Sequence, residues 1–272
     1  MKLDAYLERI GFNGVPAADF ETLAAVHRQH LLNISYENLD VQLGNPTTTS
    51  MESAYNKIVE RGRGGWCYEM NGLLNWALTE IGFDIKRVCG GVARAHRGDS
   101  AIGNHLVLIT ELDQAYVVDV GFGDGFIEPV PLKPHKFSQR GFDYELENCG
   151  DGYWRMHNHA NGGAPSFDFT LTPADEELLS TQCKSLQTSE DSPFMLALIC
   201  QRFVEHGYEI QLGRMAKTVT TAGVRTELLD SADDLVTRLR DVFQLDIPEV
   251  ADLWPRIVER HETIFEAVGQ QS

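Results

Sequence analysis

The segment "RGRGGWCYEMNGLL", residues 61–74, places two adjacent glycines, a tryptophan and a cysteine directly before a periodic apolar run. Apolar residues recur at helical spacing, at Met70, Leu73, Leu74, Ala77, Leu78 and Ile81. Gly82 follows at the position of a C-terminal helix cap. We therefore predict a helix that begins at about Cys67 and is entered through a turn at Gly64–Gly65. Its polar side is expected to carry Glu69, Asn71, Asn75 and Glu80.

A cysteine at the start of a helix has two explanations. Free cysteine is among the most buried residue types, so Cys67 can be a packing residue. A helix N-terminus also stabilises a thiolate, so Cys67 can be a nucleophile. A cysteine nucleophile needs a base, and the base needs a group that orients it.

Residues 104–123, "NHLVLITELDQAYVVDVGFG", supply both groups. His105 opens one apolar strand and Asp119 lies near the end of the next. If the hairpin is centred on Leu112, the two residues are directly opposite, with Cβ atoms ~5 Å apart on one face. A turn one residue longer or shorter places them on opposite faces. Each residue also has an ordinary structural explanation, so a Cys-His-Asp site and a packing role both stay open here.

Composition restricts the class of protein. The chain has 272 residues, 43% of them hydrophobic, which is typical of a globular protein with one large domain or two to three small ones. Its formal charge of −17 argues against nucleic-acid binding. Five cysteines without a C-x-x-C argue against a disulfide framework or a structural zinc site. We expect a cytoplasmic protein, because no secretory signal and no membrane-spanning apolar run are evident. We also expect no bound metal.

The remaining segments predict helices first and strands afterwards. Helices are expected within residues 4–12, 16–34 and 51–62, after Ser231 and after Pro248. His27 and His30 are interpreted as a helix-surface pair, since no third metal ligand is nearby. Strands are expected within residues 85–95, 104–110, 114–123, 142–148, 153–158, 194–203, 208–214, 215–221 and 223–229. "GFGDG", residues 121–125, lacks the last glycine of a phosphate loop and predicts a tight turn with Phe122 as a pocket wall.

Several of these motifs together resemble the arylamine N-acetyltransferases. "RGGWCYEMN" at 63–71, the histidine at 105 and "DVGFGD" at 119–124 carry the resemblance. "YLERIGF" at 6–12, "ISYENLD" at 34–40, "SPF" at 192–194 and "LGR" at 212–214 are similar to family segments in the same order. The resemblance therefore extends over essentially the whole chain.

The resemblance implies an α+β fold with a cysteine-protease-like core. Residues 1–84 would form a helical bundle, residues 85–190 an antiparallel β-barrel, and residues 191–272 an α/β lid. A Cys-His-Asp triad would consist of Cys67, His105 and Asp119. Arg63 and Glu37 match the family's supporting ion pair, and Phe122 and Tyr36 match aromatic positions of the acceptor pocket.

The activity that the resemblance implies is transfer of an acetyl group from acetyl-CoA to arylamines or arylhydrazines, or to the oxygen of N-hydroxyarylamines. The small-molecule acceptor and coenzyme A are then the expected partners, with no nucleic acid, membrane or metal. Ser35-Tyr36 departs from the family's Pro-Phe and adds a hydroxyl to the pocket wall. No segment is assigned to coenzyme A.

Three other interpretations are compatible with the same residues. A relative on this scaffold would close amides from a carrier-bound acyl chain. A papain- or transglutaminase-like hydrolase would use Cys-His-Asp in the same chain order, with water as the acceptor. A non-catalytic binding module would keep the pocket and an ordinary thiol.

Overall fold

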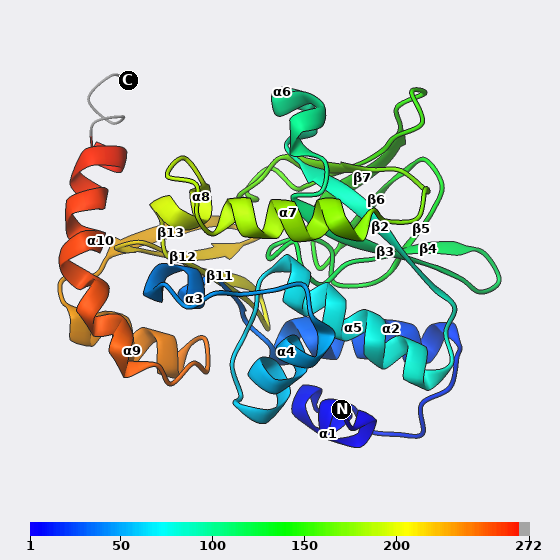
Figure 1. The fold of residues 1–272 in the computed structure, drawn as a ribbon, viewed down its shortest axis with the longest axis horizontal. Helices are drawn as coiled ribbons and strands as arrows, with labels where there is room; N and C mark the ends of the chain where they lie inside the picture. Colours follow the sequence, from blue (N-terminus) through cyan, green and yellow to red (C-terminus); the bar gives the residue numbers. More distant parts are fainter. Residues whose placement is uncertain (267–272) are drawn as a thin grey trace.

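The predicted helix after the double glycine is α5, which runs from Cys67 to Ile81 and ends at Gly82 with a φ of 112°. It is the central helix of the computed structural model, which describes residues 1–266 (Figure 1). The other N-terminal helices surround it: α1 (Leu3–Ile10), α2 (Phe20–Asn33), α3 (Leu39–Leu43) and α4 (Met51–Tyr55), which continues as a π-helical turn at Asn56–Glu60. The expected N-terminal helical bundle is therefore present.

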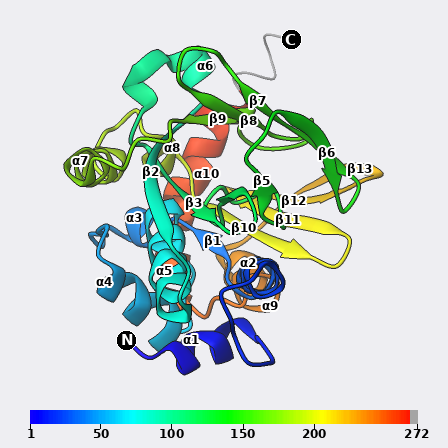
Figure 2. The ribbon, with the colours of Figure 1, turned by 90° about the vertical axis from the view of Figure 1, so that its right-hand side faces the viewer.

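An eight-stranded antiparallel sheet packs beside α5, with the order β5-β4-β3-β2-β9-β8-β7-β6 (Figures 1 and 2). Its strands are β2 (Ile85–Val92), β3 (His105–Glu111), β4 (Ala115–Val118), β5 (Val130–Pro131), β6 (His135–Gln139), β7 (Phe142–Asn148), β8 (Trp154–His157) and β9 (Ser166–Phe169). A short helix, α6 (Arg94–Arg97), and a 3-10 turn, Gly98–Ala101, connect β2 to β3. The expected barrel is thus a curled sheet that does not close, because β5 and β6 are its edges.

A second antiparallel sheet has the order β1-β10-β11-β12-β13. Four of its strands are C-terminal: β10 (Ile199–Val204), β11 (Gly207–Leu212), β12 (Met215–Thr220) and β13 (Gly223–Leu228). The fifth, β1 (Tyr36–Glu37), comes from the N-terminal part and pairs with β10. One face packs on α9 (Ala232–Asp241), where Cys200 joins Leu235 and Leu239 in a buried cluster. The chain continues through a 3-10 turn (Pro248–Leu253), α10 (Trp254–Arg260) and a π-helical turn (His261–Glu266).

Several local predictions were incomplete, and strands β1, β5, β6 and β9 were not expected from the sequence. The strand expected within residues 194–203 is divided between a short helix, α8 (Pro193–Leu196), and β10. Helix α7 (Glu176–Leu186) was missed, although its sequence carries the signal. Asp175 caps its N-terminus by accepting from the Leu178 N–H, and Leu179 and Leu186 are buried on one face. None of the helices within residues 1–266 has the length and apolarity that crossing a membrane requires.

Helix α5 is buried on nearly every side, so the prediction of a polar outer face was wrong for two residues. Glu69 is 4% exposed and Asn71 is 0% exposed. The helix lies between the N-terminal segment and β3, so its polar residues meet backbone and charged groups instead of solvent. The turn before it requires glycine, because a Cβ at Gly64 would lie 2.1 Å from the Ser35 carbonyl oxygen.

Candidate active site

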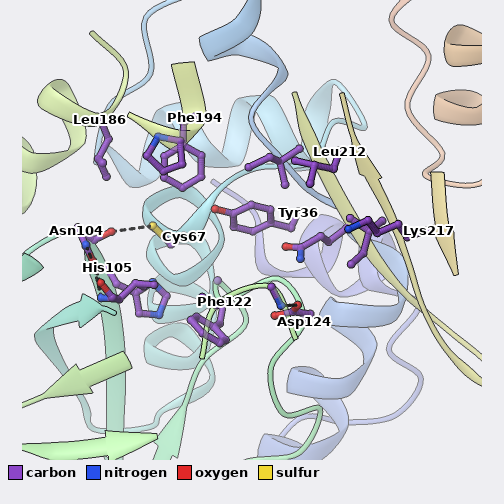
Figure 3. A pocket seen from close by; sticks show the side chains of 18 of the residues that line it. Tyr36, Cys67, Asn104, His105, Phe122, Asp124, Leu186, Phe194, Leu212 and Lys217 are labelled. Atoms are coloured by element: carbon purple, nitrogen blue, oxygen red, sulfur yellow. Dashed lines mark hydrogen bonds between the residues drawn. The ribbon is translucent and has the colours of Figure 1, made fainter. Parts of the chain in front are cut away.

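Cys67 is the first residue of α5 and is 1% exposed. The segment before it is held by backbone hydrogen bonds, from the Gly65 N–H to the Ser35 oxygen (3.2 Å) and from the Glu37 N–H to the Gly65 oxygen (2.9 Å). The Cys67 thiol lies 3.8 Å from the Asn104 carbonyl oxygen, to which it donates weakly (Figure 3). The sulfur is therefore fixed at the wall of a pocket, at the start of a helix.

His105 and Asp119 are in direct contact, with 2.6 Å between His105 Nε2 and Asp119 Oδ2. The predicted register was wrong, however. Leu108 pairs with Val118, so the turn is centred on Asp113, and β4 ends before Asp119. A shift of two residues keeps side chains on the same face, which is why the contact survives. Because Nε2 is bonded to Asp119, the other ring nitrogen, Nδ1, is the one available to a thiol.

Asn71 holds Asp119 from the helix side and was not identified from the sequence. Its Nδ2 donates to Asp119 Oδ1 (2.7 Å) and to the Leu106 oxygen, and its Oδ1 accepts from the Val120 N–H (2.9 Å). Asn71 lies four residues after Cys67, one turn along the same helix face. That spacing was the only local signal for its role.

His27 holds the backbone of Asp119 from the opposite side, so the prediction of a helix-surface pair was wrong. His27 and His30 are both 0% exposed. His27 Nδ1 lies 2.8 Å from the Ile127 oxygen, and its Nε2 lies 3.2 Å from the Asp119 nitrogen. Burial lowers the pKa of His27 to about 4, so the ring is neutral at neutral pH. A carbonyl only accepts, and the ring faces two carbonyl oxygens, because Nε2 also lies 3.1 Å from the Asp119 oxygen. The contact of Nδ1 with the Ile127 oxygen is the shorter one, which favours the proton on Nδ1, with Nε2 accepting from the Asp119 N–H.

The electrostatics of Cys67 show that its place at the start of the helix does not by itself favour a thiolate. Burial raises the pKa of the thiol well above its ordinary value, and the charge of Asp119 acts in the same direction. A lone thiolate is therefore unfavourable in this pocket. An imidazolium at His105 would supply the compensating charge.

A buried ionic cluster supports the cysteine loop. Arg63 Nη2 lies 3.0 Å from Glu37 Oε1, so the structure brings this predicted pair together. Lys57, which was not identified from the sequence, is 3% exposed and contacts Glu37 (3.5 Å), Asp40 (2.9 Å) and Glu69 (2.9 Å). Burial alone would lower the pKa of Lys57, but these carboxylates outweigh it and raise the pKa. Glu69 also accepts from the Trp66 N–H (3.2 Å), which connects the cluster to the start of α5.

Cys67 and His105 open onto a cavity of about 320 Å³. Tyr36 and Phe122 line the same cavity, and the Phe122 ring meets the His105 ring edge-on at 5.8 Å between centroids (Figure 3). The wall beside the cysteine requires glycine, since a Cβ at Gly121 would lie 2.7 Å from the Cys67 Cα. Four predicted site residues thus line one cavity, with Asp119 behind His105, whereas Arg63 and Glu37 do not line it.

Asp124 adds a carboxyl group to the cavity and was not singled out from the sequence. It is 1% exposed, and burial raises its pKa to about 6. Its Oδ2 accepts from the Gly163 N–H (2.6 Å) and its Oδ1 accepts from Asn158 Nδ2 (3.1 Å). Within the described residues, no group of three or more His, Cys, Asp or Glu side chains is arranged to hold a metal ion.

Known proteins are similar to this chain in both sequence and fold. A family model described as N-acetyltransferase matches residues 19–251. The arylamine N-acetyltransferase of Mycolicibacterium smegmatis is 30% identical over 282 residues, which cover 97% of this chain and 99% of that protein. The chain belongs to the arylamine N-acetyltransferase family. The resemblance inferred from the motifs is thereby confirmed.

Solved arylamine N-acetyltransferases confirm the three-part fold as well. The M. smegmatis arylamine N-acetyltransferase structure superposes with a TM-score of 0.86 at 31% identity, covering 95% of this chain and 98% of that one. A Mycobacterium marinum arylamine N-acetyltransferase solved in complex with CoA gives 0.85 at 25% identity, with the same coverage. This chain is therefore an enzyme of the arylamine N-acetyltransferase family along nearly its whole length.

Proposed function

We propose that this enzyme transfers an acetyl group from acetyl-CoA to the nitrogen of arylamines and arylhydrazines through an acetyl-Cys67 intermediate. N-hydroxyarylamines would accept the group on oxygen. The observation that supports this most directly is the arrangement of His105. Its Nε2 is bonded to Asp119 at 2.6 Å while Cys67 lines the same cavity, so Nδ1 is left for the thiol.

In the first half-reaction, His105 Nδ1 removes the thiol proton of Cys67. Asp119 stabilises the resulting imidazolium, and the imidazolium offsets the raised pKa of the buried thiol. The Cys67 sulfur attacks the thioester carbonyl carbon, so its bond to carbon forms while the bond from carbon to the coenzyme sulfur breaks. Backbone N–H groups at the start of α5 would stabilise the oxyanion. His105 returns its proton to the departing coenzyme thiolate.

In the second half-reaction, the amine nitrogen attacks the acetyl carbon on Cys67. The carbon–nitrogen bond forms, the bond to the Cys67 sulfur breaks, and His105 receives the amine proton. The aromatic wall at Phe122 favours flat acceptors and limits access of water, which would otherwise hydrolyse the acyl-enzyme. Asn71 and His27 would preserve the geometry by holding Asp119.

The fit of the acyl donor can be judged from the cavity. Cys67 lies at its wall and Lys217 and Arg97 are cationic side chains of its lining, which suits a donor with a thioester and phosphate groups. A relative solved in complex with CoA supports the same donor. When bound, acetyl-CoA supplies an activated acetyl group.

The test is incubation of the protein with acetyl-CoA in the absence of amine, followed by intact mass and peptide mapping. We expect one acetyl group on Cys67, discharged by an added anisidine or hydrazide. The chain contains four other free cysteines, and half-buried Cys89 serves as an internal control. Acetylation spread over Cys89 and Cys67 alike, or turnover retained in Cys67→Ser, would refute the proposal.

A further inference from the structure

A single row of side chains crosses four strands of the five-stranded sheet, on the face that forms one wall of the cavity. Tyr36 is the register partner of Gln201, Gln201 of Ile210, and Ile210 of Lys217. Register partners in antiparallel strands point to the same face. All four side chains line the cavity together with Cys67. We call Tyr36, Gln201, Ile210 and Lys217 the lid row.

The lid row leads away from the reacting sulfur. Figure 3 shows the hydroxyl end of Tyr36 directed toward Cys67, with Lys217 on the far side of Tyr36. Neighbouring strands are ~4.8 Å apart, so three strand steps separate Tyr36 from Lys217 by ~14 Å. A substrate that reaches both ends is therefore elongated.

Three of the four side chains have polar groups that no described residue satisfies. The Tyr36 hydroxyl, the Gln201 amide and the Lys217 ammonium make no side-chain hydrogen bond or ion pair within residues 1–266. Tyr36 is nevertheless only 7% exposed and Gln201 only 9%. Neither the Tyr36 hydroxyl nor the Gln201 amide is among the fully buried polar atoms that lack a partner, so both face the cavity, where a ligand can take the place of water as their hydrogen-bond partner. Burial raises the pKa of Tyr36, which keeps its hydroxyl protonated and able to donate.

The charge at Lys217 is notable in this chain. Acidic residues outnumber basic ones by 40 to 23, and buried Lys57 contacts carboxylates at 2.9 Å. Lys217 has no such partner among the described residues. Asp124, the carboxyl group of the same cavity, is instead bonded to the Gly163 N–H and to Asn158. The cationic end of the lid row is thus free for an anion.

We propose that the lid row binds an elongated substrate whose neutral polar part lies along Tyr36 and Gln201 and whose anionic group lies at Lys217. This inference rests on the proposed function, because it assumes that the reacting carbon is at Cys67. The anionic group has two chemical sources. It is either a phosphate of the acyl donor or the carboxylate of an acceptor with a long tail.

The variant that tests the row is Lys217→Met, with Lys217→Arg as the conservative rescue. Lys86→Met is the matched control, because Lys86 is also on a strand, is exposed and does not line the cavity. In a ping-pong scheme, kcat/KM for each substrate reports on its own half-reaction. Donors would be acetyl-CoA and the uncharged p-nitrophenyl acetate. Acceptors would be 4-(4-aminophenyl)butanoate and its methyl ester.

Loss of one charge-assisted contact predicts a fall of about tenfold to hundredfold in one kcat/KM. A fall for acetyl-CoA but not for p-nitrophenyl acetate supports the row with the donor phosphate as its anion. A fall for the aminophenylbutanoate but not for its ester supports the row with the acceptor carboxylate. In either case, Lys217→Arg should return kcat/KM to about its wild-type value. If Lys217→Met matches Lys86→Met for all four substrates, the proposal is overturned.

Binding measurements separate this inference from the proposed function. Calorimetric titration with coenzyme A and with the aminophenylbutanoate requires no turnover. If wild-type Cys67 is not acetylated but Lys217→Met still weakens binding at least tenfold, the proposed function fails, while the binding of an anion at Lys217 is retained without the assumption that the reacting carbon lies at Cys67. If Cys67 is acetylated normally while Lys217→Met leaves both binding and kinetics unchanged, the lid row fails alone.

Discussion

His27 offers the most discriminating test of how the site is held together. The change is His27→Leu, which keeps a similar volume but removes both ring nitrogens. It leaves the Asp119 N–H and the Ile127 carbonyl without their present partner in a fully buried place. Each unsatisfied buried group costs about 1–3 kcal/mol, so the free energy of unfolding should fall by about 2–6 kcal/mol.

The matched control is His30→Leu, on the same helix and equally buried. His30 is bonded to the Tyr6 hydroxyl at 2.9 Å and has no contact with Asp119, and its Nε2 has no hydrogen-bond partner within the described residues. This variant orphans one group, so it should cost about 1–3 kcal/mol. It separates general destabilisation from an effect on the site.

The functional readout is the pH dependence of Cys67 alkylation by iodoacetamide, measured beside chemical denaturation. In His27→Leu the backbone of Asp119 loses one anchor, so Asp119 should stabilise the His105 imidazolium less well. We expect the rise in Cys67 reactivity to move to higher pH and the acetylation rate to fall about tenfold or more. In His30→Leu the pH profile should match that of the wild type. Identical profiles for the two variants would refute a positioning role for His27.

Acid should weaken the folded protein through the same residue. The pKa of His27 is about 4 when folded, because of burial, against ~6.5 for an exposed histidine. Between these values the unfolded chain binds more protons, so stability falls as the pH decreases from ~6.5 to ~4. The difference corresponds to about 3 kcal/mol. In His27→Leu, the denaturation midpoint should fall less steeply between pH ~6.5 and ~4 than it does in the wild type.

Three further predictions concern the surroundings of the site. Lys57→Met should lower the free energy of unfolding by about 3–5 kcal/mol in urea titrations, because it leaves buried carboxylates uncompensated, whereas exposed Lys86→Met should not. Gly121→Ala should reduce acetylation of Cys67 at least tenfold by mass spectrometry, since its Cβ would lie 2.7 Å from the Cys67 Cα; an unchanged rate would contradict the tight approach. Asp124 has a pKa raised to about 6 by burial, so its ionisation costs stability as the pH rises from ~3.8 through 6. The free energy of unfolding of Asp124→Asn minus that of the wild type should therefore be about 3 kcal/mol higher at pH ~8 than at pH ~4, as measured by denaturation. The same difference at both pH values would exclude a raised pKa.

Sequence patterns alone were sufficient for the elements that carry the reacting groups. Helix α5 was predicted with its start at Cys67, because its apolar residues recur every three to four positions and Gly82 ends it. β3 was predicted from its apolar, β-branched run, with His105 as its first residue. These features are local, since periodicity and caps depend on neighbouring residues. The family followed from the motifs around Cys67, His105 and Asp119.

Only the tertiary structure decided how Asp119 is held. The register of the hairpin depends on the length of its turn, which the sequence did not specify. The observed register differs from the predicted one by two residues, which leaves Asp119 on the same face as His105 and in contact with it. His27 was interpreted as a surface residue although it shares a helix face with Leu23, Ala24 and Leu31, and it is buried against a segment 92 residues away. The helical spacing could indicate that this face is buried, but it could not indicate which segment packs against it.

The cavity wall is likewise formed by segments that lie far apart in the sequence. Tyr36 and Gln201 become neighbours because a two-residue strand from the N-terminal part pairs with β10. Lys217 joins them through two further strand pairings. The sequence by itself predicted the long helices other than α7, most of the strands, the family, and the cysteine, histidine and aspartate of the reacting group. The partners that surround those residues come from segments far apart in sequence, and only folding brings them into contact.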